Sequence, residues 1–372
     1  MLMLPVRKSH PIIKLVSNSL TDLPAPLNIS LWWNYGSLLI TFLIIQILTG
    51  LFLSIHYAPN IELVFSSLNH ISRNINWGWI IHNTHINSAS IFLLCIYIHM
   101  ARGIYFNSYK HKTTWNTGVT IFIITIATAF MGYVLPWGQI RFWGATVITN
   151  IFSAIPYLGD QLVKWLWGGF AVTNPTLNRF FIIHFLLPFI IILIATLHII
   201  LLHESGSNNP LGIRSNSDRI PFHIYFSTKD IIGLTIIITL LLISIIFCPN
   251  IVNDPENFIN ANPLITPTHI QPEWYFLWLY AILRSIPNKL GGVIALITSI
   301  IILYLPALTN IKKKSASFNP IIQFIFFMLL ISLIILSWIG RCPVESPFIH
   351  IGQIFTTFFF LFFFILPKVQ NI

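Results

Sequence analysis

The chain has 372 residues, of which 55% are hydrophobic and only 8% are charged, whereas a soluble domain carries about a quarter charged residues. This composition excludes a soluble fold and predicts an all-α protein that crosses a membrane several times. A formal net charge of +10 could suit a nucleic acid, but a membrane protein with basic loops needs no such partner, so we expect none.

The first 30 residues are predicted to be an amphipathic segment that lies on the membrane surface. Prolines and basic residues interrupt its apolar residues, so it does not resemble a secretory signal and we expect no cleaved targeting segment. We expect two domains to follow, one over residues 31–210 and one over residues 211–372.

Charged side chains are costly at the bilayer centre and therefore mark the ends of membrane spans. Eight long stretches contain no Asp, Glu, Lys or Arg, and they predict spans within residues 31–57, 77–101, 113–140, 180–202, 231–253, 290–311, 318–340 and 346–367. A ninth uncharged stretch, residues 142–159, is short and polar, which favours an interfacial or re-entrant segment.

Eight spans divide the loops between two membrane sides, of which side one carries both termini. Side one then holds 13 basic and four acidic residues, a net charge of +9, and side two holds seven basic and six acidic residues, a net charge of +1. The positive-inside rule predicts that side one faces the cytoplasm or its equivalent, the matrix in a mitochondrion.

Two predicted spans each carry two histidines, and in both spans the two are 14 residues apart: His85 and His99 in the second, His184 and His198 in the fourth. Fourteen helical residues turn through about 1400° and rise about 21 Å, so both members face nearly the same way. An interhelical hydrogen bond remains the commoner role of a membrane histidine. His56 and His70 share the spacing, but Pro59 lies between them and we assign them no role.

Glycine recurs at the same spacing in the first and third spans, as Gly36 and Gly50 and as Gly118 and Gly132. Close helix packing is one explanation; the other is a flat group that needs close approach to the backbone at two depths. Together with the histidines, this repetition favours two haems inside a four-helix bundle, each iron held by two imidazoles. The three scattered cysteines include no CxxCH motif, so covalent haem attachment is not expected.

Several motifs resemble cytochrome b, the haem-bearing subunit of the ubiquinol–cytochrome c reductase (bc1 complex, complex III) of mitochondria, over essentially the full length of the chain. They are WWNYGSLL (32–39), GYVLPWGQ (132–139), FWGATVITN (142–150), HFLLPF (184–189), LHESGSNNP (202–210) and QPEWYFLWLYAILRSIP (271–287). The resemblance implies that His85 and His184 bind a low-potential b-type haem on side two. It also implies that His99 and His198 bind a high-potential haem on side one.

The family uses two arginine positions near the haem propionates, and this chain keeps an arginine at one of them. Arg102 matches the arginine expected near the high-potential haem. The other position, three residues before the first ligand, holds His82, and an imidazole is a weaker partner for an anion than a guanidinium.

The resemblance also implies two quinone sites. At the ubiquinol oxidation site on side two, Glu273 would accept a proton, and the site would be lined by Tyr133, Gly144, Phe276 and Tyr280. At the ubiquinone reduction site on side one, His203 and Asp230 would hand over protons. The residues expected to surround that quinone with them are Trp33, Asn34, Ser207, Phe222 and Lys229.

As a member of this family, the chain would work in the mitochondrial inner membrane, within a homodimeric complex with the Rieske iron–sulfur protein, cytochrome c1 and other subunits. One electron of each quinol would reach the iron–sulfur protein, and the other would cross the membrane to reduce quinone, which builds a proton gradient (the Q cycle). The alternatives are a non-pigmented transporter or structural membrane subunit, and a different dihaem enzyme that would lack the PEWY segment at 272–275.

Overall fold

The computed structural model describes residues 5–309 and 315–370 of the chain. Two predictions extend beyond these residues: the start of the N-terminal segment, and the end of the sixth span with the lysines at 312–314 that follow it. The described residues include eight helical segments long and apolar enough to cross a membrane: Leu31–His56, Gly78–Tyr105, Lys112–Val134, Asn174–Ser205, Tyr225–Phe247, Lys289–Leu308, Pro320–Ile339 and Phe348–Val369. The eight predicted spans are therefore confirmed.

These spans are built from helices α3 (Tyr35–His56), α5 (Gly78–Tyr105), α6 (Lys112–Val134), α9 (Asn174–Ser205), α10 (Tyr225–Phe247), α12 (Lys289–Ile301) continued by α13 (Leu305–Leu308), α14 (Pro320–Ile339) and α15 (Phe348–Val369). Some helices run past the predicted ends, since α5 continues beyond Arg102 and α9 begins before Arg179. A charge therefore marks the edge of the apolar layer, and the helix continues beyond it.

The ninth uncharged stretch forms short helices, as predicted for a segment that does not cross the membrane. Helix α7 (Gln139–Asn150) has 12 residues, and at 1.5 Å per residue it is about 18 Å long, too short to span about 30 Å of hydrocarbon. The turn η4 (Ile151–Ala154) and helix α8 (Gly159–Trp167) follow it. Gln139 and Arg141 bond to the loop that follows α10, through the Ile265 carbonyl and the Asn253 side chain.

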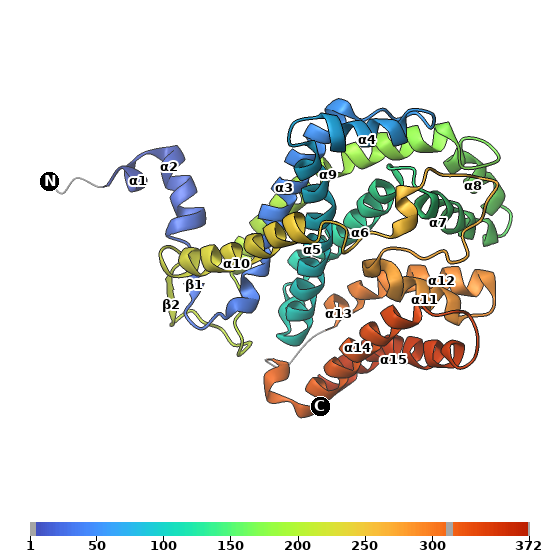
Figure 1. Cartoon of the computed structure of the whole chain (residues 1–372). Helices are drawn as coiled ribbons and strands as arrows, with labels where there is room; N and C mark the ends of the chain where they lie inside the picture. The colour runs from blue at the N-terminus through green and yellow to red at the C-terminus, as the bar shows by residue number, and fades with distance from the viewer. Residues whose placement is uncertain (1–4, 310–314, 371–372) are drawn as a thin grey trace.

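The N-terminal segment lies apart from the main body in Figure 1. It comprises α1 (Val6–Ser9), α2 (Pro11–Val16) and η1 (Ser17–Thr21), and every residue from Pro5 to Val16 is exposed. The strand β1 (Pro24–Pro26) then pairs antiparallel with β2 (Arg219–Pro221), with Ala25 opposite Ile220. This pairing joins the N-terminal segment to the loop that precedes α10.

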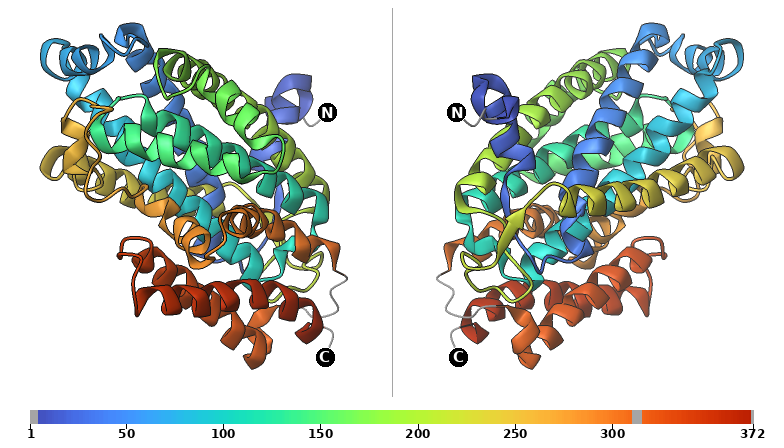
Figure 2. Two further views of the ribbon diagram at one scale, coloured as in Figure 1. Left: turned by 90° about the vertical axis from the view of Figure 1, so that its right-hand side faces the viewer. Right: turned by 90° about the vertical axis from the view of Figure 1, so that its left-hand side faces the viewer.

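The first four spans pack as a bundle in which α3 lies against α5, α6 lies against α9, and α3 also contacts α9. Helix α10 crosses the outside of this bundle on α5 and α3 (Figure 2). The short α4 (Val64–Asn74) lies on α5. The predicted four-helix bundle is thus made of the helices that carry the paired histidines and glycines.

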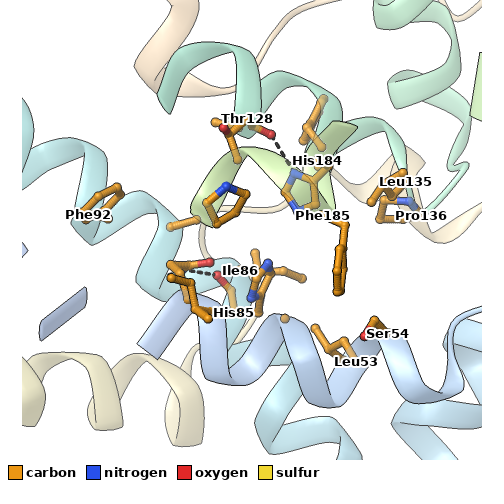
Figure 3. A pocket seen from close by; sticks show the side chains of 18 of the residues that line it. Leu53, Ser54, His85, Ile86, Phe92, Thr128, Leu135, Pro136, His184 and Phe185 are labelled. Carbon is orange, nitrogen blue, oxygen red and sulfur yellow. Dashed lines mark hydrogen bonds between the residues drawn. The ribbon is translucent and has the colours of Figure 1, made fainter. Parts of the chain in front are cut away.

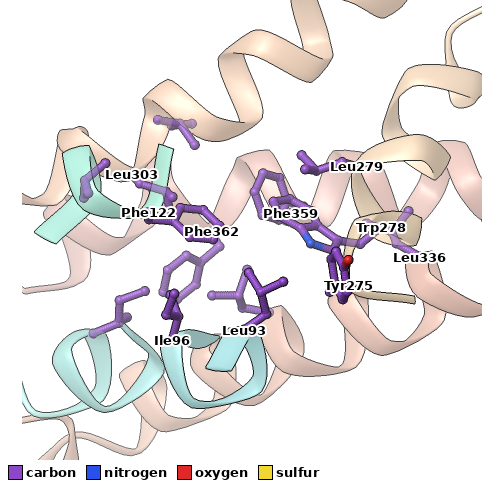
Figure 4. Packing of buried hydrophobic residues seen from close by; sticks show 14 of the residues in the cluster. Leu93, Ile96, Phe122, Tyr275, Trp278, Leu279, Leu303, Leu336, Phe359 and Phe362 are labelled. Carbon is purple, nitrogen blue, oxygen red and sulfur yellow. The ribbon is translucent and has the colours of Figure 1, made fainter. Parts of the chain in front are cut away.

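The last three spans pack around the short α11 (Leu277–Ser285), which contacts α12, α14 and α15. One apolar core joins this group to the bundle. In Figure 4, Leu93 and Ile96 of α5 and Phe122 of α6 face Phe359 and Phe362 of α15. The Trp115 indole N–H donates to the Leu303 carbonyl across the same boundary, so the two groups of spans share a continuous interior.

Candidate functional site

The four histidines of the bundle meet as two facing pairs, one toward each end of the bundle. The ring centroids of His85 and His184 are 6.4 Å apart, and those of His99 and His198 are also 6.4 Å apart. Each pair joins α5 to α9. Because the two histidines of each helix are 14 residues apart, the two pairs lie between the same two helices at two depths, about 21 Å apart along α5.

Each glycine of the repeated set faces one of these imidazoles across the bundle. The nearest atom to a Cβ built on the glycine is the histidine Cε1 in every case: Gly36 with His99 at 3.7 Å, Gly50 with His85 at 3.2 Å, Gly118 with His198 at 3.2 Å and Gly132 with His184 at 2.3 Å. A side chain at Gly132 would overlap the ring. The glycines therefore keep the space around the four imidazoles free.

The hydrogen bonds of the pair nearer side two fix which ring nitrogen carries the proton. The Thr49 hydroxyl donates to the Ile45 carbonyl, so it accepts from His85 Nδ1 at 2.8 Å. His184 Nδ1 donates to the Thr128 carbonyl at 2.8 Å. A proton on each Nδ1 leaves the lone pair of each Nε2 for a metal, the arrangement usual for metal-binding imidazoles.

The second pair has one imidazole arranged in the same way. The Thr117 hydroxyl donates to the carbonyl of Thr114 and accepts from His198 Nδ1 at 3.1 Å. At His99, however, the guanidinium of Arg102 donates to Nδ1 at 3.2 Å. Arginine cannot accept a hydrogen bond, so Arg102 must turn away from Nδ1 if Nε2 of His99 is to bind iron.

The spacing of each pair fits an iron that brings its own in-plane ligands. Two metal–imidazole bonds of about 2 Å, with about 1 Å from each nitrogen to its ring centre, give a centroid separation of about 6 Å. Among the described residues, no group of three or more His, Cys, Asp and Glu side chains is arranged to hold a metal ion. Two protein ligands suit a haem iron, whose macrocycle fills the other positions.

A cavity of about 220 Å³ surrounds His85 and His184. In Figure 3 the two imidazoles point into it between Phe92, Phe185 and Leu53. Its wall is mainly apolar, as expected for a site that takes a large flat ring. The residues at this pair therefore fit a haem on three counts: the free Nε2 atoms, the glycine clearance and the apolar cavity.

The same cavity extends to Glu273, the carboxylate of the PEWY segment, and to Tyr133. Glu273 lies at the start of η6 (Trp274–Phe276), outside the membrane spans. Burial raises the pKa of its carboxyl to about 7, an effect that nearby Arg141 opposes and Asp254 reinforces. A carboxyl with this pKa can take up or release a proton near neutral pH.

Three other residues predicted at the oxidation site do not line this cavity. A Cβ built on Gly144 meets nothing within 4 Å, so open space lies beside it. Phe276 belongs to the buried apolar core. The Tyr280 hydroxyl donates to the Ile270 carbonyl at 3.4 Å, and its ring lies under the Arg284 guanidinium.

Arg141 was not predicted as a site residue, but it is 5% exposed and lines the cavity together with His82 and the first histidine pair. It stands in an otherwise uncharged region between two motifs, GYVLPWGQ and FWGATVITN. An arginine within residues 113–159 that no acidic residue accompanies was a signal that could have identified it.

On side one, the structure gathers part of the predicted reduction site. The Asn34 amide donates to the Lys229 carbonyl at 2.7 Å, and the Lys229 ammonium donates to the Ile29 carbonyl at 2.8 Å. Trp33 and Phe222 pack against one small apolar cluster that includes Phe226. These contacts join the start of α3 to the start of α10.

The remaining members of that set are less closely joined. His203 lies in the last turn of α9, Ser207 follows the helix end, and Asp230 is in the second turn of α10. No ion pair links His203 to Asp230 in the part of the chain that the structure describes. Arg102 lies over the Trp33 ring, 5.2 Å from its centroid, and so connects this region to the His99 pair.

Comparison with known proteins identifies the family. The family model described as cytochrome b/b6/petB matches residues 20–206, and that described as cytochrome b(C-terminal)/b6/petD matches residues 260–360. A solved structure titled "Hyperthermophilic respiratory Complex III" has 32% sequence identity and a TM-score of 0.93, with 98% of each chain covered. This chain is thus a multi-pass, b-haem-binding electron-transfer protein, and it belongs to the cytochrome b family of bc1-type complexes.

Proposed function

We propose that the chain is the quinone-reacting subunit of a mitochondrial ubiquinol–cytochrome c reductase and that it works through the Q cycle. The observation that carries this proposal is the pair of facing imidazole sets, each cleared by two glycines. One of these sets shares its cavity with the carboxyl of Glu273. An electron site and a proton acceptor therefore lie side by side at one end of the bundle.

His85 and His184 would hold the low-potential haem, and His99 and His198 the high-potential haem. When bound, two haems that each take two of these imidazoles would supply a reversible one-electron path across the apolar layer and not a site for oxygen. Around them, Gly36, Gly50, Gly118 and Gly132 give room at the ring faces. Arg102, once released from His99, would pair with a propionate of the high-potential haem.

Quinol oxidation needs an acceptor for protons, and Glu273 fits this role. Burial keeps its carboxyl half ionised near neutral pH, and it lies outside the spans, where a proton can reach water. Tyr133 borders the same cavity. We place Gly144, Phe276 and Tyr280 farther along the quinol site, where the open space beside Gly144 would admit the quinol ring.

At the other end, His203 and Asp230 would donate protons to the two carbonyls of the bound quinone. The quinone would lie against Trp33 and Asn34, and the hydrogen bond from Asn34 to Lys229 would hold this wall in place. Among the described residues no ion pair joins His203 to Asp230, so neither side chain takes up the charge of the other. Ser207 would complete the polar contacts.

This division of labour implies a wider assembly. The Rieske iron–sulfur protein would take one electron of each quinol and pass it to cytochrome c1, within a homodimeric complex with further subunits. Both chain termini would face the matrix. We further propose that residues 1–30 rest on the membrane surface, that residues 31–210 form the dihaem domain and that residues 211–372 form a second domain.

The test is the pigment and activity of the complex purified from membranes in mild detergent. We expect two b-type signals in the reduced-minus-oxidised spectrum, two haems per copy of this chain and reduction of cytochrome c by ubiquinol. A colourless complex would instead support the transporter or structural alternative. Two haems without quinol oxidation would retain the electron path and reject the quinone assignment.

A further inference from the structure

Arg141 is a buried cation without an anionic partner. Its side chain is 5% exposed, and the one ion pair among the described residues joins Arg7 to Asp22 instead. Its guanidinium donates to the Asn253 side chain at 3.2 Å and lies 4.7 Å from the centroid of the Tyr133 ring. The Nε–H has no hydrogen-bond partner. An unpaired buried charge is costly, by several kcal/mol, so this arrangement indicates that an anion is missing.

The position of Arg141 points to the anion. It lies in the first turn of α7 and forms part of the wall of the cavity that His85 and His184 enter. The carboxylates of Glu273 and Asp254 lie beyond ion-pair distance of its guanidinium. A group bound between the two imidazoles would therefore meet Arg141 from inside the cavity.

Two other arginines lie over aromatic rings and also have an unpaired Nε–H, and they differ in what their terminal nitrogens meet. Those of Arg284 donate to the carbonyls of Gly340 and Cys342 at 3.1 and 2.7 Å. Those of Arg102 donate to the side chains of Ser108 and His99, so Arg102 resembles Arg141, whose terminal nitrogen donates to the Asn253 side chain. One arginine of this kind thus accompanies each histidine pair.

We propose that Arg141 binds a propionate of the haem held between His85 and His184, in the role for which His82 is a weak partner. This inference rests on the proposed haem ligation. His82 lines the same cavity, and its Nδ1 is 3.5 Å from the Ser72 hydroxyl. An imidazole offers at most two donors, whereas a guanidinium offers a planar pair that matches a carboxylate and keeps its charge at any physiological pH.

The cation supplied by α7 has an electrostatic consequence that can be measured. A fixed positive charge beside a haem favours the reduced form, because reduction adds an electron to the site. Removal of that charge, with the propionate left unpaired, lowers the midpoint potential of that haem. A tenfold change in its reduction equilibrium corresponds to about 59 mV for one electron.

The experiment is an optical redox titration of the purified complex, with the haem-to-protein ratio measured in parallel. In Arg141→Gln we expect the reduction equilibrium of the haem at His85 and His184 to change about tenfold, which lowers its midpoint potential by about 59 mV. The midpoint potential of the other haem should stay unchanged. Arg141→Lys should keep most of the wild-type value. Adding His82→Arg to Arg141→Gln should restore the midpoint. Arg341→Gln, an exposed residue outside the cavity wall, is the control for an equal loss of charge.

Each outcome separates this inference from the haem ligation on which it rests. An unmoved midpoint in Arg141→Gln, with both haems present, overturns the role of Arg141 and leaves the ligation intact. A changed pH–rate profile with an unmoved midpoint also overturns it and assigns Arg141 to Glu273. Absence of haem from the wild-type complex rejects both. If Arg141→Gln does not assemble, Arg141→Lys and the rescued double variant still decide, since neither removes the cation from the cavity.

Discussion

Glu273→Gln is the change that best tests proton acceptance at the oxidation site. The carboxyl has a pKa of about 7 against an ordinary value of 4.5, chiefly because it is buried. This difference corresponds to on the order of 3 kcal/mol in favour of the neutral acid. If the carboxylate is the base, the rate of quinol oxidation depends on its ionised fraction, which is about one half at pH 7 and about one tenth at pH 6.

The assay is steady-state reduction of cytochrome c by quinol between pH 5 and pH 9. The wild-type kcat/KM should rise nearly tenfold from pH 5 to pH 6 and about fivefold from pH 6 to pH 7, and it should level off above pH 7. Glu273→Gln should lose both this rise and most of the activity. Thermal stability adds an independent check. A raised pKa gives stability that is present below pH 4.5 and is lost as the pH rises through about 7, so the wild type should lose this stability over that range and the Gln variant should not. An unchanged inflection in the Gln variant refutes the assignment.

Three further predictions concern the bundle and α7. His99→Ala should remove the side-one haem and leave the other, as counted from the reduced-minus-oxidised spectrum, while His70→Ala should keep both. Gly132→Ala puts a Cβ 2.3 Å from the facing imidazole, which should cost about 1–3 kcal/mol and weaken haem retention about tenfold or more. The control is Gly169→Ala, where a Cβ meets nothing within 4 Å. Equal haem content in the two variants would contradict the reasoning. Gly144→Ala should leave the melting temperature unchanged or raised, since Ala favours a helix by about 1 kcal/mol over Gly. The same change should raise the KM for quinol, and an unchanged KM would place the quinol ring elsewhere.

The spans could be predicted from the sequence because the bilayer penalises charge more strongly than any local preference does. The helix ends could not, because a helix continues in water past the last apolar residue. Asn174–Ser205 is the clearest case, with Arg179 and Glu204 inside the helix. Helix length therefore depends on caps and packing, and the position of the apolar layer depends on charge.

The two histidine pairs could also be predicted, since both members of each set lie on one helix and share its period. Arg141 could not be placed, because it reaches the cavity from α7, and no period relates that helix to α5 or α9. The proposed quinone sites have the same limitation. Glu273 reaches the cavity from the segment after α10, so only the fold brings it beside His85.

The distribution of acids supports the proposal that electrons and protons take different routes through this chain. Within the eight spans that the structure describes, the carboxylates are Glu204, in the last turn of α9, and Asp230, in the second turn of α10. Neither lies near the middle of the apolar layer, where a proton relay would need ionisable groups. The imidazole pairs, in contrast, stand at two depths about 21 Å apart. In the proposed function, protons would be exchanged at the ends while electrons would cross between them, and each crossing would work against about 2.3 kcal/mol per 100 mV of membrane potential.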